Sequence, residues 1–254
     1  MLGKRAWEFL TGNKVGSYLP YAFGEIALLV VGILVALQID NWNERRKESI
    51  LEAEYYCRLY ESALQDRIQI NRLQTESQNR LSASIDMMAE LQDEDPDRDY
   101  VASKMLAAIR LSGTAFHPDT SAFDDIKSSG NINVLQDTEV KDQVSKYYTN
   151  VIAISTNHTA NTDQMITAFF DQADGIGAGW LNLEIMKNTF EGSAVDIERL
   201  VKKYPLTEEI AFKLMNDAII YVAINARGAD HLQSILNHII DITRVLEMKC
   251  DDTI

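Results

Sequence analysis

The sequence predicts an all-α protein in which one N-terminal transmembrane helix runs into an antiparallel helical-bundle domain. A continuous apolar run from Leu19 to Ile39 has the length of a membrane span. Three longer stretches further along repeat their apolar residues with the period of an amphipathic helix. The sequence shows neither the alternating pattern of half-buried strands nor an internal repeat.

The composition is that of a folded, acidic protein. Of its 254 residues, 46% are hydrophobic and 24% are charged, so the chain is neither disordered nor uniformly apolar. Its net charge of −14 argues against a nucleic-acid partner, because attraction to phosphate requires a basic surface. With 2 cysteines, a disulfide-rich scaffold and a cysteine-ligated zinc site are excluded.

Residues 18–42 form the predicted transmembrane helix. No polar side chain occurs from Ile26 to Leu37, and the aromatic rings of Tyr21 and Trp42 bracket the run. From Tyr21 to Trp42 the helix would extend about 31 Å, close to the thickness of the hydrocarbon layer. A buried helix of a soluble protein fits these features less well, and a cleaved signal peptide would need a small-residue site at its end.

Residues 1–17 precede this helix and place apolar side chains beside Lys4 and Arg5. They fit either a short interfacial helix lying on the membrane or a frayed tail, and the sequence leaves both open. Aromatic and basic side chains are expected at the two membrane interfaces. These interfacial anchors are Trp7, Tyr18, Tyr21, Trp42, Arg45, Arg46 and Lys47.

The orientation of the span follows only weakly from its flanks. Three basic side chains precede it and three follow it, so the positive-inside rule gives a tie. Residues 1–50 carry six basic and five acidic side chains, which leaves a net charge of −15 on residues 51–254. The short basic tail and the acidic domain downstream favour an N-terminus in the cytoplasm. Residues 43–254, the predicted acidic bundle domain, would then lie on the other side.

Glu25 is the residue of the span that most needs an explanation, because a carboxylate inside a membrane is costly. With Gly32, Ala36 and Asp40 it falls roughly on one helix face, where small residues permit close helix–helix approach. In a structural interpretation Glu25 bonds to a neighbouring helix or reaches the head groups, and in a functional one it lines an ion path. The predicted intramembrane polar and assembly residues are Glu25, Gly32, Ala36, Gln38 and Asp40.

Two blocks of sequence carry a family resemblance. The first is YLPYAFGEIALLVVGILVALQIDNWNERRKE, which follows the pattern Y-x-x-G-E-I-x-L-x-x-x-G-I-L-x-A-L-Q-x-x-N-W-N-E-x-R-K from Tyr21 to Lys47. The second and weaker block is TSAFDDIKSSGNINVLQD. The first resembles the opening of a bacterial family of small single-span membrane proteins of unknown function. The resemblance implies one span followed by a helical domain in a bacterial membrane, and it brings no activity. With the orientation that the flanks favour, we expect a single-pass protein of the bacterial inner membrane whose C-terminal domain lies in the periplasm.

The first half of the domain is predicted to be one long helix followed by short ones. Helical periodicity covers residues 44–92, and nothing between Ile39 and Leu51 separates this helix from the span. The segment 93–99 breaks the pattern at Pro96, and a helix over 98–112 follows. Thr120 or Ser121 then offers an N-cap for a short helix that stops at Gly130.

Two long helices are predicted in the second half. Asp137 would cap a helix over 138–172, and Thr207 would cap the last helix, over 208–248. Between them we expect a glycine-rich loop at 174–180 and short helices near 181–190 and 194–203. The long helices together suggest an antiparallel bundle.

Few residues indicate chemistry. The chain contains no catalytic serine elbow, zinc-protease motif or Walker loop, and the glycines between residues 174 and 180 lack the preceding strand of a dinucleotide site. His231, His238 and Asp241 could supply half of a metal site, but ordinary bundle histidines are the favoured interpretation. We therefore expect no cofactor, no metal and no enzymatic activity.

The expected function is that of a non-enzymatic assembly or accessory subunit anchored in a membrane. The protein would be a homo-oligomer or part of a larger complex, with the lipid bilayer and either itself or other membrane-protein subunits as partners. The main alternative is an oligomeric ion- or proton-conducting, or stator-like, protein that uses Glu25. A second alternative is a single-span sensor whose bundle binds a ligand.

Cys57 and Cys250 test the architecture. With an even number of long traverses the last helix returns toward the membrane, which brings both cysteines to the same end of the domain. A disulfide also requires Cα atoms within about 7 Å and an oxidising compartment. Two unpaired thiols are the favoured interpretation, and a disulfide is the alternative.

Overall fold

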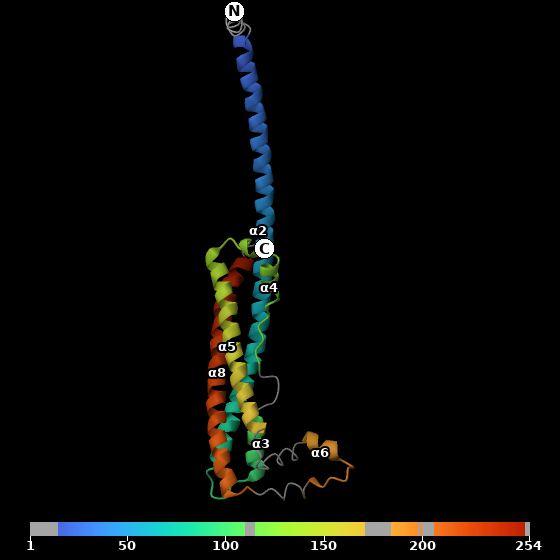
Figure 1. The fold of residues 1–254 in the computed structure, drawn as a ribbon, viewed down its shortest axis with the longest axis vertical. Coiled ribbons are helices and arrows are strands. Elements are labelled where there is room, and N and C mark those ends of the chain that lie inside the picture. The colour runs from blue at the N-terminus through green and yellow to red at the C-terminus, as the bar shows by residue number, and fades with distance from the viewer. Residues whose placement is uncertain (1–14, 110–114, 171–183, 198, 200–205, 252–254) are drawn as a thin grey trace, which may run out of the picture. The chain divides into compact units, whose positions relative to one another are not determined.

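The computed structural model describes residues 15–109, 115–170, 184–197, 199 and 206–251 (Figure 1). Over these residues it consists of α-helices and one 3-10 turn, without strands, which confirms the all-α prediction. Trp7, the predicted loop at 174–180 and half of the predicted helix at 194–203 lie outside the described residues.

Helix α2 runs from Val15 to Glu90 and covers both the apolar run and the first helix of the bundle. The predicted continuity between Ile39 and Leu51 is therefore confirmed. By packing, the chain divides into two compact units, Met1–Glu54 and Tyr55–Ile254. In the first unit every side chain from residue 20 to residue 50 is exposed, including Leu28 at 76%. An apolar helix with no protein packed around it is a candidate membrane span.

Three short elements follow α2: helix α3 (Arg98–Ile109), helix α4 (Ser121–Ser128) and the 3-10 turn η1 (Asn131–Asn133). Helix α3 begins where predicted because the side chain of Asp97 accepts hydrogen bonds from the free N–H groups of its first turn. Thr120 occupies the N-cap position of α4 without a side-chain bond. Gly130 ends this region at a φ of 74°, a left-handed conformation that favours glycine. The turn η1 was not predicted.

The second half of the bundle contains helices α5 (Thr138–Phe170), α6 (Glu184–Phe190) and α8 (Glu208–Asp251). Both predicted caps are confirmed. The carboxylate of Asp137 accepts from the N–H groups of Glu139 and Val140, and the hydroxyl of Thr207 accepts from the N–H of Ile210. The long helices consequently start within one residue of their predicted positions.

Helices α2 and α8 are paired antiparallel in the second unit, with α5 beside α8 (Figure 1). The contacts that define the first pairing are Tyr60–Glu247 at 3.1 Å, Gln74–Gln233 at 3.0 Å and Ser84–Asn225 at 2.8 Å. A step of 14 residues along α2, from Tyr60 to Gln74, is matched by a step of 14 residues back along α8, from Glu247 to Gln233. These two pairs share one register, and Ser84–Asn225 departs from it by two residues, so the helices stay antiparallel along the bundle, as predicted.

The core is an apolar seam between α2, α3, α5 and α8. Toward the end of the bundle where α3 lies, one cluster joins all four helices around Tyr221, which is fully buried. Removing these side chains from water supplies the main free energy of folding, about 25 cal/mol for each Å² of apolar surface. The largest members of the cluster are Met87, Leu91, Met105, Ile109, Met165, Phe169, Leu214 and Tyr221.

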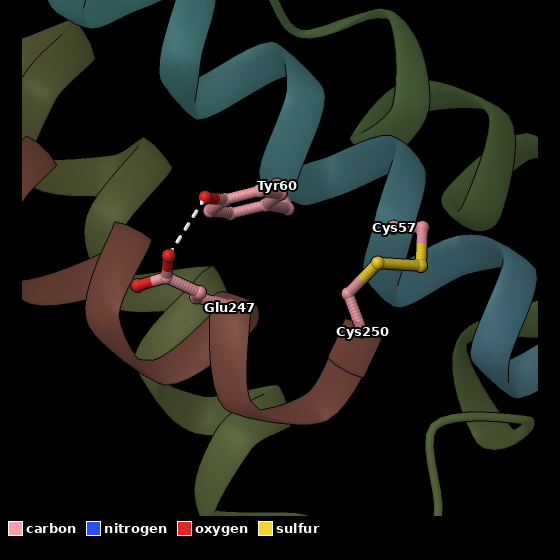
Figure 2. The surroundings of a disulfide bond; sticks show 4 residues. All are labelled: Cys57, Tyr60, Glu247 and Cys250. Atoms are coloured by element: carbon pink, nitrogen blue, oxygen red, sulfur yellow. Dashed lines mark hydrogen bonds between the residues drawn. A yellow bond between two sulfur atoms is a disulfide. The ribbon is translucent and has the colours of Figure 1, made fainter. Parts of the chain in front are cut away.

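Cys57 and Cys250 form a disulfide, so the favoured interpretation of two unpaired thiols is wrong (Figure 2). The register of α2 against α8 explains the bond. From the Tyr60–Glu247 pair, a step of three residues back along α2 reaches Cys57, and a step of three residues forward along α8 reaches Cys250. Their Cα atoms lie 4.9 Å apart, within the range for a disulfide. The bond joins residues 193 positions apart in sequence and ties the end of α8 to α2.

Replacing both cysteines by serine should lower the free energy of unfolding by about 2–5 kcal/mol, because the unfolded chain regains the freedom that the cross-link removes. For a unit of this size the midpoint of thermal unfolding should fall by roughly 5–20 °C, measured by circular dichroism in mild detergent. Tyr60→Phe, which removes only the exposed hydrogen bond to Glu247, is the control and should change the midpoint little. Equal midpoints for the double serine variant and the unaltered protein would contradict this account.

Candidate functional site

The predicted intramembrane residues all lie in the part of α2 that belongs to the first unit, and all are exposed in the single chain. At about 100° per residue, helix geometry puts Glu25, Gly32, Ala36 and Asp40 on one side and Gln38 on the opposite side. A Cβ added at Gly32 would meet nothing within 4 Å. The face is therefore open for contact with lipid or with another helix.

The described interfacial anchors bracket this helix. Tyr21 is 83% exposed and Trp42 is 64% exposed, and the guanidinium of Arg46 lies 5.9 Å above the indole ring of Trp42. Arg45 and Lys47 are also exposed. Tyr18 lies in the helix, but its side chain is outside the described residues, as is all of Trp7. One aromatic ring thus stands toward each end of the apolar run, as expected for an interfacial belt.

One end of the bundle is held by a group of contacts that we call the clasp. The disulfide Cys57–Cys250 is at its centre, and polar bonds tie α2, α4, η1, α5 and α8 around it. These bonds are Arg58–Asp125 at 2.6 Å, Tyr55–Asn131 at 3.0 Å, Tyr60–Glu247 at 3.1 Å and Asp137–Lys249 at 2.8 Å. Half-exposed ion pairs contribute about 0–1 kcal/mol each, so the disulfide is the strongest member. Of these residues, the sequence analysis identified the two cysteines and Asp137, the last of them as a helix cap.

A buried carboxylate, missed by sequence analysis, lies between α2 and α5. Asp66 is 2% exposed and accepts hydrogen bonds from the Tyr147 hydroxyl at 2.6 Å and the Asp119 N–H at 2.8 Å. Burial raises the pKa of Asp66 above its ordinary value, while its two donors act in the opposite direction. The Tyr148 hydroxyl donates to the backbone carbonyl of Asp119 at 3.1 Å, which fixes the segment that leads into α4.

A second polar cluster joins α2, α3 and α8. Asn225 is 3% exposed and donates from its amide nitrogen to the Ser84 hydroxyl at 2.8 Å and to the Ala108 carbonyl at 3.1 Å. An apolar partner at this level would leave buried groups unsatisfied, so these bonds favour one register of α8 on α2. Both clusters hold the bundle together.

The histidines considered as half of a metal site are not brought together. His231 packs edge-on against His158 of α5, with ring centroids 6.2 Å apart, beside a close approach of α5 to Gly228. His238 and Asp241 instead line a shallow groove between α5 and α8. Among the described residues no group of three histidine, cysteine or carboxylate side chains could hold a metal ion. The arrangement is that of bundle histidines.

Tyr147→Phe should lower the free energy of unfolding by about 1.5–3 kcal/mol at pH 7, because it removes a hydrogen bond to a charged group. Since that bond favours ionised Asp66, the loss should shrink as the pH falls through the raised pKa of this carboxyl group. Urea unfolding in mild detergent at pH 7 and pH 4.5 measures both values.

Tyr148→Phe is the matched control, because its hydroxyl bonds to a neutral carbonyl, and its effect should not depend on pH. Comparing variants at each pH cancels the opposite contribution of Asp119 and Asp137, whose pKa values are lowered and whose stabilisation is lost in acid. A Tyr147→Phe penalty that grows in acid would refute the assigned bond.

The comparisons with known proteins identify a family. Residues 25–163 match a family of unknown function, DUF6090, over the stretch from Glu25 in α2 through α3, α4 and η1 to Asp163 in α5. Both resembling blocks fall largely or wholly within this range. No curated protein and no solved structure matches the chain. Because the match covers more than half of its residues, the chain belongs to DUF6090, a family of unknown function.

Proposed function

We propose that this protein is a non-enzymatic assembly or accessory subunit, anchored by the single span of α2 in the bacterial inner membrane, with its helical bundle in the periplasm. The observation that carries the proposal is the disulfide between Cys57 and Cys250. Disulfides persist in oxidising compartments and are rare in the cytosol, where thiols are kept reduced. The bond thus favours one side of the membrane where the basic flanks give a tie.

The exposed apolar side chains of α2 support the membrane anchor. Leu28, Leu34 and Trp42 are each more than half exposed on a helix with no protein around it. In water this surface would be a severe aggregation hazard, whereas a bilayer covers it on all sides. A helix also satisfies its own backbone hydrogen bonds, as the hydrocarbon layer requires.

The surroundings of Glu25 support assembly. One turn away on the same helix are Tyr21, Ala22, Leu28 and Leu29, none of which is basic. Inside a bilayer its negative charge therefore needs compensation from a lipid head group or from another helix. The buried polar groups Asp66 and Asn225 are engaged in bonds that hold the bundle together, which fits a structural role for both.

The anchor and its orientation can be measured together. After carbonate extraction the intact protein should remain in the membrane pellet, because apolar burial holds it rather than surface charge. When intact cells are opened with an alkylating reagent present, Cys57 and Cys250 should be protected from alkylation until a reductant is added. Release of the protein into the soluble fraction would refute the membrane anchor. Two free thiols in the native compartment would refute the periplasmic location of the domain.

Glu25→Gln separates assembly from ion conduction. The substitution should leave insertion intact, since it removes a charge, and should weaken the oligomer seen by crosslinking in membranes. Glu48→Gln, at an exposed position beyond Trp42 and away from this face, is the control. A proton or ion leak in liposomes that requires Glu25, with assembly unchanged, would instead favour the conducting alternative. Unchanged assembly without a leak would leave Glu25 with neither role.

A further inference from the structure

Helix α5 has an exposed surface without charge, which is unusual in so acidic a domain. From Tyr147 to Thr162 it contains no aspartate, glutamate, lysine or arginine, although Ile152, Ala153, Thr156 and Ala160 are exposed there. In the second unit, α2 and α8 have no uncharged stretch of this length. Solvated helix faces normally carry charge, so this surface, which we call the α5 face, shares with interface cores the depletion of charged residues.

The hydroxyl groups of the α5 face are already used within the helix. Thr149 donates to the carbonyl of Ser145, and Thr156 donates to the carbonyl of Ile152, both at 2.8 Å. Satisfied donors lose little on leaving water. Desolvating this face therefore costs less than its threonine content suggests.

A groove adjoins the α5 face. Residues 115–120, which lead into α4, belong to no helix or strand, and Phe116 and Pro118 form a wall beside Ile152, Thr156 and Ala160. The groove has a volume of about 420 Å³. Its wall is firm, because Phe116 is fully buried and its carbonyl accepts a hydrogen bond from the hydroxyl of Ser155. In the described part of the chain, no helix lies over this groove.

We propose that the α5 face and its groove bind a second copy of this chain. Charge selects this occupant. Residues 51–254 carry a net charge of −15, so two copies repel one another wherever their surface carboxylates meet. Two α5 faces have no carboxylate to bring together, except Asp163 at the edge of each face. The inference rests on the proposed membrane anchor, which gives both copies the same orientation and raises their local concentration.

A two-fold contact places a residue near the axis against its own counterpart. Thr156 belongs to both the α5 face and the groove, so Thr156→Cys should crosslink two full-length chains in membranes under mild oxidation. Ala223→Cys, at an exposed small residue of α8, is the matched control. We expect at least about tenfold more dimer from Thr156→Cys. Equal yields from the two variants would overturn the proposal.

A second pair of variants tests the role of charge. Ala160→Glu should weaken dimerisation at least about tenfold, since it sets two carboxylates against each other, and Ala223→Glu should not. Intact mass in mild detergent measures the dimer, and protection of Cys57 and Cys250 from alkylation shows that each variant has folded. Equal dimer in both variants would contradict the α5 interface.

The same membranes distinguish this inference from the proposed function. If Thr156→Cys fails to crosslink while the protein resists carbonate and keeps its disulfide, the α5 interface is wrong and the anchored periplasmic domain stands. If carbonate releases the protein or both thiols are free, the proposed function is refuted. The crosslink and the intact mass then decide whether the second copy binds without a membrane.

Discussion

The antiparallel pairing of α2 with α8 is the constraint on which the rest of the bundle depends. Once Tyr60 lies against Glu247, the equal rise of both helices brings Gln74 to Gln233 and Cys57 to Cys250. Apolar packing alone tolerates a shift of one turn at modest cost. The same shift would break the Asn225–Ser84 bond and leave buried amide and hydroxyl groups unpaired, which costs much more. Polar bonds and the disulfide thus specify an arrangement whose free energy comes mainly from the apolar seam.

Local signals in the sequence were sufficient for most of the elements. Asp137 and Thr207 cap the long helices because a side-chain oxygen one position before a helix satisfies its free N–H groups, and this needs no tertiary information. The turn η1 was not predicted. It follows Gly130, which signals the end of a helix but does not determine the conformation of the next residues. Helix ends are the least specified part of such patterns.

The candidate site was predicted less completely, for a physical reason. Asp66 stands beside Arg67 in an amphipathic pattern and resembles a surface carboxylate. The hydrogen bonds that allow its burial come from Tyr147 and Asp119, which are 81 and 53 residues away in the sequence. The disulfide depended likewise on a register that periodicity leaves open. The assembly role of the span residues stays a prediction, made because a carboxylate in an apolar helix is conspicuous without any knowledge of what it contacts.

Because the two cysteines are 193 residues apart in the sequence, the disulfide can form only after the chain has been synthesised as far as Cys250. At about 5–20 residues per second, Cys57 of an exported chain waits roughly 10–40 s before Cys250 is synthesised. During that interval its thiol is available to thiol oxidases and to the cysteines of neighbouring nascent chains. A product that stops short of Cys250 can never close the bond. In the proposed periplasmic location, the oxidised state therefore marks chains that have been synthesised and exported through Cys250.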